Sequence, residues 1–345
     1  MPRIIAGDAG RSSIKVAYFD EATKKIKTHL TEARHAKVDM AYLKNQPILD
    51  WNPDTQILVS VDGSDIWAYS KGTDKFAPPE SVMHVTEDKM YLEYANTYLL
   101  ATVAQVVKDK EEVMLSINMT YSNHQHKDAV KGKLGGAHNV KFYSPNGKVV
   151  KEINFTVTKI TTLFQGWSSL LYMLIGEDMK ENNFYTGQII LMDMGSKTLD
   201  CVLCQELTAV KGISYDLGTT YMFELIKNNL SAKHQIKKQT YEIEQMIMKG
   251  MVLYAKDGTE IDMKGYLKDA IYTMAERIVN TVNEDFGSYY PQGVVLTGGG
   301  IRYFKDILER ELYPNHKPKF EVPADPQFSN AVGMARFVVF NREQK

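Results

Sequence analysis

Short apolar runs separated by glycine-containing turns recur along the 345-residue chain. RIIAGD and IKVAYF lie within the first 20 residues, and QIILMD and LDCVLC lie on either side of residue 195. Runs of this length predict strands joined as hairpins. Elsewhere apolar residues recur at every third or fourth position, which predicts helices at 91–108, 166–175 and 266–286. This mixture of strands and helices predicts an α/β chain.

Further apolar runs complete the pattern. The runs at 113–119 and 294–296 predict buried strands, because they carry no charged residue. VKFYS and VVKEINFTVTKI, which ends near residue 160, predict two more strands. PKFEVP predicts a last short strand before a closing helix at 328–340. Residues 32–88 have no regular period and predict a small insertion subdomain.

The segment QIILMDMGSKTLDCVLCQ at 188–205 carries the strongest candidate chemistry. The turn between its two strands has little side-chain bulk, since it contains Gly195, Ser196 and Thr198. Bare backbone N–H groups beside a glycine form a site for phosphate. Asp193 at the mouth of this turn would repel phosphate unless a cation lay between them, and Mg²⁺ is the usual cation of nucleotide sites. The turn therefore predicts a metal–nucleotide site, with a plain hairpin as the alternative for this stretch alone.

The N-terminal segment RIIAGDAGRSSIKVAYF repeats this pattern. In both segments an apolar strand ends in Asp, and Gly follows two positions later. After three further residues the second strand begins with an apolar, a charged and an apolar residue. Two copies of one supersecondary unit predict a duplicated fold in which each half supplies one wall of a site. The aligned positions are Asp8 with Asp193, Gly10 with Gly195, and Lys15 with Asp200.

A third glycine-rich segment, QGVVLTGGGIRYF, lies near the C-terminal end of the chain. Its apolar strand is followed by Gly298, Gly299 and Gly300, and Ile301 begins a predicted helix. A strand–glycine turn–helix unit lets a ligand lie against bare backbone and directs helix N–H groups at an anionic or nucleotide ligand. A tight turn without a ligand is the alternative.

Composition and charge exclude several other classes of function. The net charge of −1 and the isoelectric point of about 6.7 show no basic excess, so direct DNA binding is not expected. No run of 18 uncharged apolar residues is present, so no membrane span is expected. The start MPRIIAGD lacks the form of a signal peptide, and Cys201 and Cys204 fit buried residues in a reducing compartment. A cytoplasmic location is therefore predicted.

Together, the two aspartate hairpins, the helix after Gln165 and the late glycine turn resemble the actin, heat-shock chaperone and sugar-kinase ATPase superfamily. DAGRSSIKV, DMGSKTLD and VVLTGGG are similar to its first phosphate hairpin, its second phosphate hairpin and its adenosine turn, in the same order. The resemblance spans residues 4–340. It implies an actin-like α/β fold with two lobes, each with a mixed five-stranded sheet flanked by helices and each based on a ribonuclease-H-like unit.

The resemblance also implies where the lobes begin and end. Lobe I would comprise residues 1–160 and 325–345, with its insertion subdomain at about 32–88. Lobe II would comprise residues 161–324, with an insertion subdomain at about 218–272, where the sequence is charged and mixed in pattern.

Within the superfamily, the chain resembles the plasmid-segregation actins of the ParM/StbA group. The chain is short, and DMGSKTLD is close to the Asp-Leu-Gly-Gly-Thr-Thr-Leu-Asp form of that group. GISYDLGTTYMFELI is similar to the group's segment after the second hairpin. The chain also departs from the group. Ser196 and Lys197 replace Gly-Thr, Arg11 adds bulk to the first hairpin, and Gln165 stands where the best-known member has Glu, although eukaryotic actin also has Gln there.

The resemblance implies roles for individual residues. Asp8 and Asp193 would hold Mg²⁺ through water molecules, since this ion keeps part of its hydration shell. Gln165 would act with Asp193 in catalysis by orienting the attacking water, because phosphoryl transfer depends mostly on positioning and charge stabilisation. Lys15 would neutralise phosphate charge, with a solvated strand lysine as the alternative.

Further residues are implied at the nucleotide. For Glu224 and Lys227 a solvated helix face is an equally good interpretation. The full set is Gly10, Arg11, Ser12 and Ser13 of the first hairpin, Gly195, Ser196, Lys197 and Thr198 of the second, Gly218, Glu224 and Lys227 of the segment that follows, and Gly298, Gly299, Gly300 and Tyr303 of the adenosine turn.

The function implied is that of an ATPase whose nucleotide-dependent filaments segregate plasmid DNA. Its cofactors would be ATP or GTP with Mg²⁺. Its partners would be further copies of the chain in a head-to-tail filament and a DNA-bound adaptor of the ParR type, with no membrane contact. A small-molecule kinase, or another bacterial or archaeal actin relative, is the alternative. A kinase needs a catalytic carboxylate that faces a hydroxyl substrate, and the sequence offers no clear candidate.

Overall fold

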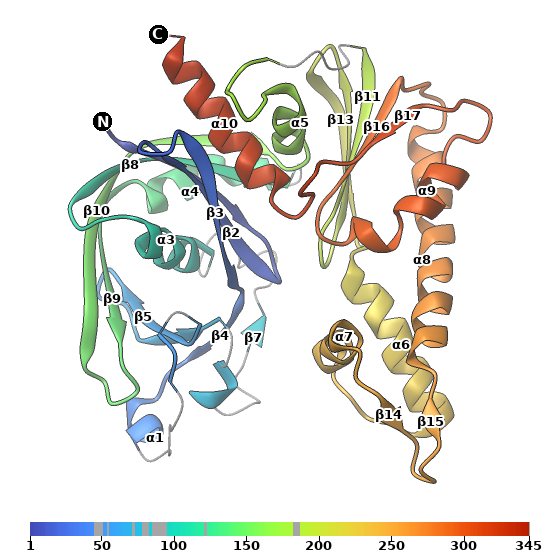
Figure 1. Ribbon diagram of the computed structural model, residues 1–345, viewed down its shortest axis with the longest axis horizontal. Coiled ribbons are helices and arrows are strands. Elements are labelled where there is room, and N and C mark those ends of the chain that lie inside the picture. Colours follow the sequence, from blue (N-terminus) through green and yellow to red (C-terminus); the bar gives the residue numbers. More distant parts are fainter. Residues whose placement is uncertain are drawn as a thin grey trace. The chain divides into compact units, whose positions relative to one another are not determined.

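A computed structural model of the chain describes residues 1–44, 51–53, 55–70, 73–77, 83–84, 95–120, 123–181 and 187–344 (Figure 1). The chain divides into two compact units. The first comprises Met1–Phe184 and Phe328–Lys345, and the second comprises Tyr185–Gln327. The first unit therefore includes the helix that follows Gln165 as well as the C-terminal helix. Each unit has a sheet of its own.

The sheet of the first unit has the strand order β3-β2-β1-β8-β10-β9-β5-β6-β4-β7 among the described residues. Its first five strands form the mixed five-stranded core that the sequence predicts, and the sheet then continues through β9 into the segment predicted as an insertion. The strands are β1 (Arg3–Ala9), β2 (Ser13–Asp20), β3 (Lys25–Glu32), β4 (Arg34–Lys37), β5 (Ile57–Val61), β6 (Trp67–Tyr69), β7 (Met83–His84), β8 (Glu111–Met119), β9 (Gly136–Tyr143) and β10 (Val149–Phe164).

Helices cover both faces of this sheet. Alternate residues of β1 point to opposite faces, so Ile5 packs in the cluster that contains α3, whereas Ala6 packs in the cluster that contains α10. The sheet curves around α3 (Figure 1). Gly333 of α10 lies so close to α5 that a Cβ there would be 1.9 Å from the Ser168 carbonyl oxygen. The helices of the first unit are α1 (Met40–Lys44), α3 (Ala95–Val106), α4 (Lys127–Leu134), α5 (Trp167–Leu174) and α10 (Ser329–Glu343), with 3₁₀ turns at Thr73–Lys75 and His124–His126.

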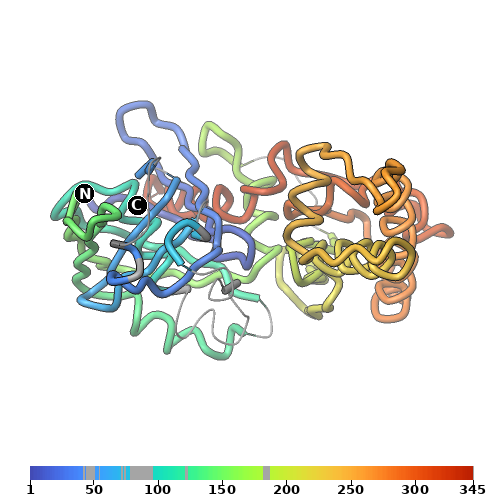
Figure 2. Tube along the Cα trace, turned by 90° about the horizontal axis from the view of Figure 1, so that it is seen from below, coloured from blue at the N-terminus to red at the C-terminus, as the bar shows by residue number. Residues whose placement is uncertain are grey.

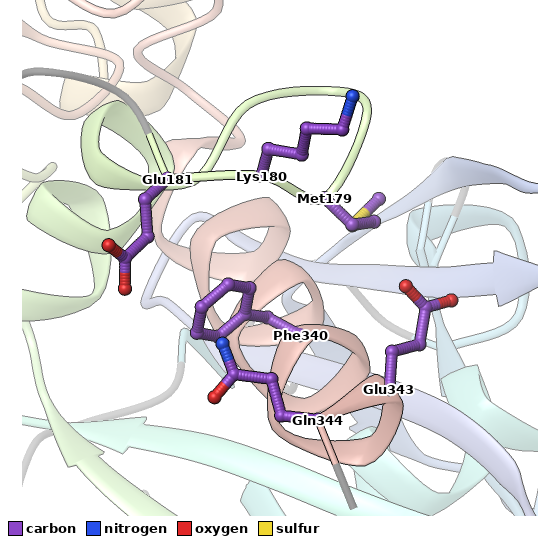
Figure 3. A pocket seen from close by; sticks show the side chains of 6 residues that line it. All are labelled: Met179, Lys180, Glu181, Phe340, Glu343 and Gln344. Carbon is purple, nitrogen blue, oxygen red and sulfur yellow. The ribbon is translucent and has the colours of Figure 1, made fainter.

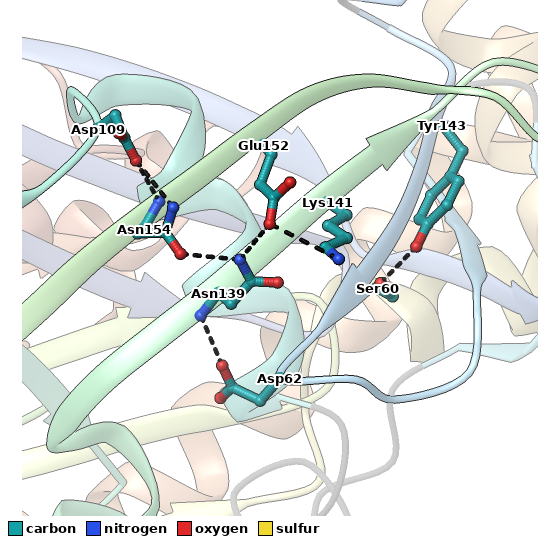
Figure 4. Close-up of polar contacts among 8 residues, drawn as sticks. All are labelled: Ser60, Asp62, Asp109, Asn139, Lys141, Tyr143, Glu152 and Asn154. Carbon is teal, nitrogen blue, oxygen red and sulfur yellow. Dashed lines mark hydrogen bonds and ion pairs between the residues drawn. The ribbon is translucent and has the colours of Figure 1, made fainter.

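Polar side chains connect the inserted strands to the core of the first unit (Figure 4). Asp62, just after β5, accepts a hydrogen bond from the Asn139 backbone N–H of β9 at 2.7 Å. The Asn139 amide donates in turn to Glu152 and to Asn154 of β10, at 2.7 and 2.8 Å. Asn154 donates to Asp109, which precedes β8, at 3.0 Å. The inserted strands are therefore bonded laterally to the core strands.

The sheet of the second unit has the order β13-β12-β11-β16-β17. Helices α6 and α8 run side by side (Figures 1 and 2), and their apolar residues pack with those of β11 and β12. A small hairpin, β14–β15, lies between α7 and α8 in the sequence. The elements are β11 (Gln188–Met194), β12 (Leu199–Gln205), β13 (Thr208–Tyr215), α6 (Thr219–His234), α7 (Thr240–Lys249), β14 (Leu253–Tyr254), β15 (Glu260–Ile261), α8 (Met263–Phe286), β16 (Gly293–Thr297), a 3₁₀ turn at Ile301–Tyr303, α9 (Lys305–Glu311) and β17 (Lys319–Glu321).

The two units share one topology. In the first, β3-β2-β1 pair antiparallel and β1-β8-β10 pair parallel. In the second, β13-β12-β11 pair antiparallel and β11-β16-β17 pair parallel. The same order with the same directions confirms the duplication that the two aspartate hairpins predict. Among the described residues, no helix has both the length and the apolar character needed to cross a membrane.

Candidate nucleotide site

The first hairpin has a narrow turn. The Gly10 N–H donates to the Ser13 carbonyl oxygen at 3.0 Å. A Cβ at residue 10 would lie 2.9 Å from that oxygen, so glycine allows this approach. The Ala33 N–H donates to the Ser12 carbonyl oxygen at 3.0 Å and holds the far side of the turn. Ser12 is exposed and Arg11 is half-buried, so part of the turn is open to solvent.

Asp8 lies in β1 directly opposite Lys15 in β2. Lys15 Nζ donates to Asp8 Oδ2 at 2.8 Å. Asp8 is 2% exposed, and the Lys15 side chain is 14% exposed. Lys15 is therefore not a solvated strand lysine. It balances the charge of a buried carboxylate at the base of the turn.

The second hairpin has the same turn bond. The Gly195 N–H donates to the Thr198 carbonyl oxygen at 2.9 Å. The start of α6 is then bonded to the other carbonyl groups of this turn. The N–H groups of Gly218, Thr219 and Thr220 donate to the carbonyl oxygens of Lys197, Gly195 and Ser196, at 2.7, 3.2 and 2.7 Å. Three successive N–H groups at a helix start thus fix the backbone of the turn.

These bonds determine which way the turn's own amides point. In a trans peptide the N–H points opposite to the C=O of the same peptide plane. Since the carbonyls of Gly195, Ser196 and Lys197 point to α6, the N–H groups of the following residues point away from it. Those N–H groups belong to Ser196, Lys197 and Thr198, which are half-buried between two buried strands. This is the backbone arrangement that a phosphate-binding turn requires.

Gly218 allows α6 to approach so closely. A Cβ at residue 218 would lie 2.3 Å from backbone atoms of Lys197. The structure therefore places this predicted nucleotide residue directly behind the turn, where the absence of a side chain brings the helix start to the turn carbonyls.

The late glycine turn packs against the same hairpin. Gly298 has φ +86°, and a Cβ there would lie 2.4 Å from Asp193 Oδ1 and from the Met194 carbonyl oxygen. The Gly300 N–H donates to that Met194 oxygen at 3.0 Å. Gly299 has more room, with its nearest neighbour a Gln327 side-chain carbon at 3.8 Å. Within the second unit, the hairpin, the α6 start and the glycine turn form one cluster of backbone groups.

Asp193 faces a different residue from Asp8. It lies opposite Asp200 in the β11–β12 ladder, and both aspartates are 2% exposed. Asp200 accepts hydrogen bonds from the hydroxyls of Thr198, at 3.0 Å, and Ser214. Like charges directly opposite one another destabilise a strand pair. Burial, and then the charges of Asp200, Asp285 and Asp193, raise the pKa of the Cys201 thiol well above its ordinary value.

Gln165 belongs to the first unit. Its N–H donates to the Met119 carbonyl oxygen at 2.8 Å, directly after β10. β1, β8 and β10 are parallel and end together, as the pairs Gly7–Ile117 and Ile117–Thr162 show. Gln165 and Asp8 therefore lie at the same end of the sheet, with β8 between their strands. In open α/β sheets, ligands bind at this carboxyl end of the strands.

Tyr303, Glu224 and Lys227 lie around α6. The Tyr303 ring makes an edge contact with Phe223, with ring centroids 6.3 Å apart. Its backbone N–H donates to Gly300 at 3.1 Å. Glu224 is exposed and Lys227 half-buried, four and seven residues after Thr220. They share the helix face of that residue, and their roles at a nucleotide stay predictions.

A metal site made by protein side chains alone is not present in the described part of the chain, where no cluster of three or more His, Cys, Asp or Glu residues could hold an ion. Mg²⁺ does not need one, since it is bound through one or two carboxylates together with water and substrate phosphates. Within the second unit the buried Asp193 carboxylate fits that mode of binding, whereas in the first unit Asp8 is ion-paired with Lys15.

A surface hollow lies at the end of α10, and none of the predicted site residues lines it (Figure 3). Its charged side chains are exposed, so it offers no desolvated group for chemistry. Its lining residues are Met179, Lys180, Glu181, Phe340, Glu343 and Gln344.

Some residues of the site were not predicted from the sequence. Thr219 and Thr220 act through their backbone N–H groups, which residue type alone does not indicate. Asp200 aligns with Lys15 in the repeated pattern, but its place opposite Asp193 follows only from the strand register.

The comparisons with known proteins agree with the fold of the chain. A family model described as archaeal actin homologue MreB-like, C-terminal, matches residues 191–310, which is less than half of the chain. The structure is similar to Ta0583, an archaeal actin homolog, with a TM-score of 0.78 at 17% identity over 100% of both chains. The chain has the actin-like fold. No curated protein matches its sequence.

Two ParM structures are also similar. The apo psk41 parM protein has a TM-score of 0.69 at 16% identity, over 99% of both chains. Bacillus thuringiensis ParM with ADP has a TM-score of 0.69 at 19% identity, over 100% of this chain and 99% of that one. At these identities the similarity shows the shared fold.

Proposed function

We propose that this chain is an actin-like ATPase that binds Mg²⁺–ATP or Mg²⁺–GTP and assembles into filaments. The observation that carries the proposal is the second hairpin turn, whose N–H groups at 196–198 point away from the α6 start that fixes its carbonyls. A rigid row of backbone donors suits a phosphate chain. The solved ParM structures with ADP and ATP support the choice of an adenine nucleotide.

The two hairpins offer different groups to a nucleotide. The first offers the turn amides at Gly10–Ser13 and the Lys15 ammonium, which is ion-paired with Asp8. The second supplies its turn amides and the Asp193–Asp200 pair. Two buried carboxylates opposite one another favour a divalent cation, so Asp193 is the stronger attachment point for hydrated Mg²⁺.

Hydrolysis depends on positioning in this proposal. Gln165 at the carboxyl end of β10 orients the attacking water, since a neutral amide directs a water without removing its proton. The bound cation neutralises charge that develops on the phosphate oxygens. Gly298–Gly300 form bare backbone against which the adenosine lies, with Tyr303 beside the base.

Binding is tested with a fluorescent ATP analogue, with Mg²⁺ and with excess chelator. We expect Asp193→Asn and Asp8→Asn to weaken the Mg²⁺-dependent affinity by about 10- to 100-fold, a loss typical of groups that orient a metal's ligands. Asp20→Asn, a half-buried aspartate at the far end of β2 from the turn, is the control and should bind like the wild type. Equal affinity with and without Mg²⁺ for all four proteins would contradict the metal role.

Assembly is supported by apolar side chains on the surface of the second unit. Met248, Met251, Val252 and Tyr254 are 50–59% exposed within seven residues of one another. Apolar groups concentrated in this way mark contact surfaces. Head-to-tail contacts between copies that do not close into a ring produce an open polymer. We propose that this segment, 248–254, contributes to the filament contact.

Pelleting after addition of Mg²⁺–ATP tests assembly. The wild type should pellet above a critical concentration, and Met251→Lys should raise that concentration without changing nucleotide affinity. Val210→Lys places the same charge at a residue of equal exposure elsewhere in the unit and is the control. Failure of the wild type to pellet at any accessible concentration would refute the filament.

The finer role follows from the ParM-group resemblance. We propose that the filaments segregate plasmid DNA through a DNA-bound adaptor of the ParR type, in the cytoplasm and without a membrane contact. The near-zero net charge agrees with an adaptor as the DNA-binding partner. Co-pelleting of labelled plasmid DNA only when the adaptor is present would test this step.

A further inference from the structure

Asn118 lies on the middle of the three parallel strands that end at the candidate site. It is 4% exposed and is the penultimate residue of β8. Ile117 and Met119 pack in the core cluster with α3. Strand alternation therefore places Asn118 on the opposite face. The pair Gly7–Ile117 fixes the register, so the next residue of β1 on that face is Asp8.

The Asn118 side-chain nitrogen is buried without a hydrogen-bond partner among the residues that the structure describes. Its neighbour across β10 is Leu163, which offers no polar side chain. A buried donor left unsatisfied keeps its full desolvation penalty and destabilises the fold. Most buried side-chain donors in proteins have a partner, so this exception requires an explanation.

The neighbouring charges indicate which kind of partner fits. On the same face, β2 contributes Lys15, β1 contributes Asp8 and β8 contributes Asn118. Lys15 donates to Asp8 Oδ2. The amide nitrogen of Asn118 is thus a second donor beside a carboxylate, at the sheet end where β1, β8 and β10 terminate. An oxygen-rich ligand held at Asp8 would receive donors from both flanking strands.

We propose that Asn118 is a positioning residue that donates a hydrogen bond from Nδ2 to an oxygen of the hydrated magnesium–triphosphate group at Asp8. This inference rests on the proposed nucleotide site. It adds a residue of β8 to the residues of β1 and β2. It also means that the Asn118 donor contributes to the affinity for the nucleotide and not to the stability of the nucleotide-free fold.

Asn118→Leu tests the inference, because leucine has a similar size and no donor. Loss of a hydrogen bond to a charged group should weaken Mg²⁺–ATP binding by about tenfold. The thermal midpoint of the nucleotide-free protein should stay unchanged or rise, because an unsatisfied buried donor is replaced by an apolar group. A donor that serves folding alone would give the opposite pair of results, with a lower midpoint and unchanged affinity.

Asn118→Asp keeps the shape and replaces the donor with a negative charge, so its affinity should fall further than that of Asn118→Leu. The matched control is Ser116→Ala, two residues earlier on the same strand face, 1% exposed and paired with Ala6. It should bind Mg²⁺–ATP like the wild type. Wild-type affinity in both Asn118 variants would overturn this inference alone. Absence of nucleotide binding in the wild type would overturn the proposed function and this inference together.

Discussion

In the first unit Asp8 faces Lys15, whereas in the second unit Asp193 faces Asp200 at the equivalent position. The first hairpin is therefore neutral at its base, and its carboxylate already has a cation at 2.8 Å. The second hairpin holds two buried carboxylates, and Asp200 is stabilised by neutral hydroxyl donors. The same backbone thus supports two electrostatic arrangements, a neutral lysine–aspartate pair in the first hairpin and two facing carboxylates in the second.

The two turns also differ in how they are supported. The first turn receives one backbone bond from outside, from the Ala33 N–H to Ser12. The second receives three, all from the start of α6. The turn fixed by α6 is the more rigid of the two, and a rigid row of donors loses little entropy when it binds phosphate.

The largest effect that this comparison predicts is at Gly218. Gly218→Ala would place a Cβ 2.3 Å from the Lys197 backbone, which separates α6 from the turn and removes its three hydrogen bonds. We expect a loss of about 3 kcal/mol in the free energy of unfolding, at the upper end for single substitutions. Urea titration followed by circular dichroism measures it.

Gly195→Ala is the control for Gly218→Ala, because a Cβ there lies 3.5 Å from the Thr198 carbonyl oxygen, an ordinary contact. It should cost far less. If the two variants were equally stable, the hydrogen bonds from α6 to the second turn would not contribute to the stability of the fold. The proposed difference in rigidity between the two turns would then be wrong.

A smaller effect is expected at Lys15. Lys15→Met leaves Asp8 buried beside an apolar group, and removal of one partner of a buried ion pair costs about 2 kcal/mol when the pair retains some exposure. Nucleotide affinity should fall as well, because the charge near phosphate is lost. Both the unfolding free energy and the binding of the fluorescent ATP analogue measure this change.

Lys27→Met is the matched control for Lys15→Met. Lys27 of β3 pairs with Asp20 of β2, and because half of the lysine side chain is exposed to solvent, this pair should contribute less than the buried pair. Equal losses in the two lysine variants would show that burial of Asp8 has no electrostatic cost, and would remove the distinction between the two hairpin bases.

The sequence was sufficient for the hairpins because their signal is local. Asp8 and Gly10 recur as Asp193 and Gly195 at the same spacing, and the ladder register confirms the match. The strand order could be expected from the resemblance. The continuation of the first sheet through β9 and β5 could not, because it depends on pairing between residues such as Val59 and Phe142, which are far apart in the chain.

The candidate site was only partly visible for the same reason. Gly218 was identified by resemblance, but its physical role depends on Lys197 backbone atoms that only the folded chain places beside it. Asn118 has no sequence signal, since a buried asparagine is notable only when its partners are counted. The sequence shows that Lys15 and Asp200 carry opposite charges at equivalent positions. Only the structure shows that each of them faces a buried aspartate.

The smallest effect concerns the two cysteines, which both lie on β12 and so report on the second unit alone. Burial raises the pKa of Cys204 from 9.0 to about 12, and that of Cys201 well above its ordinary value. The raised values favour the protonated thiol in the folded state. The contribution of the two protonated thiols to the free energy of unfolding is therefore fully present below about pH 9. It is lost as the pH rises toward the pKa values of the folded state.

Since the thiolate is the reactive form, the folded wild type should react with a thiol reagent at pH 8 far more slowly than the urea-unfolded chain. Gly218→Ala should react faster than the wild type, because it loosens the unit that contains β12. Lys15→Met should react at the wild-type rate, because its defect lies in the first unit. Equal acceleration in both variants would mean that the two units unfold together as one cooperative structure. The defects could then not be assigned to separate units.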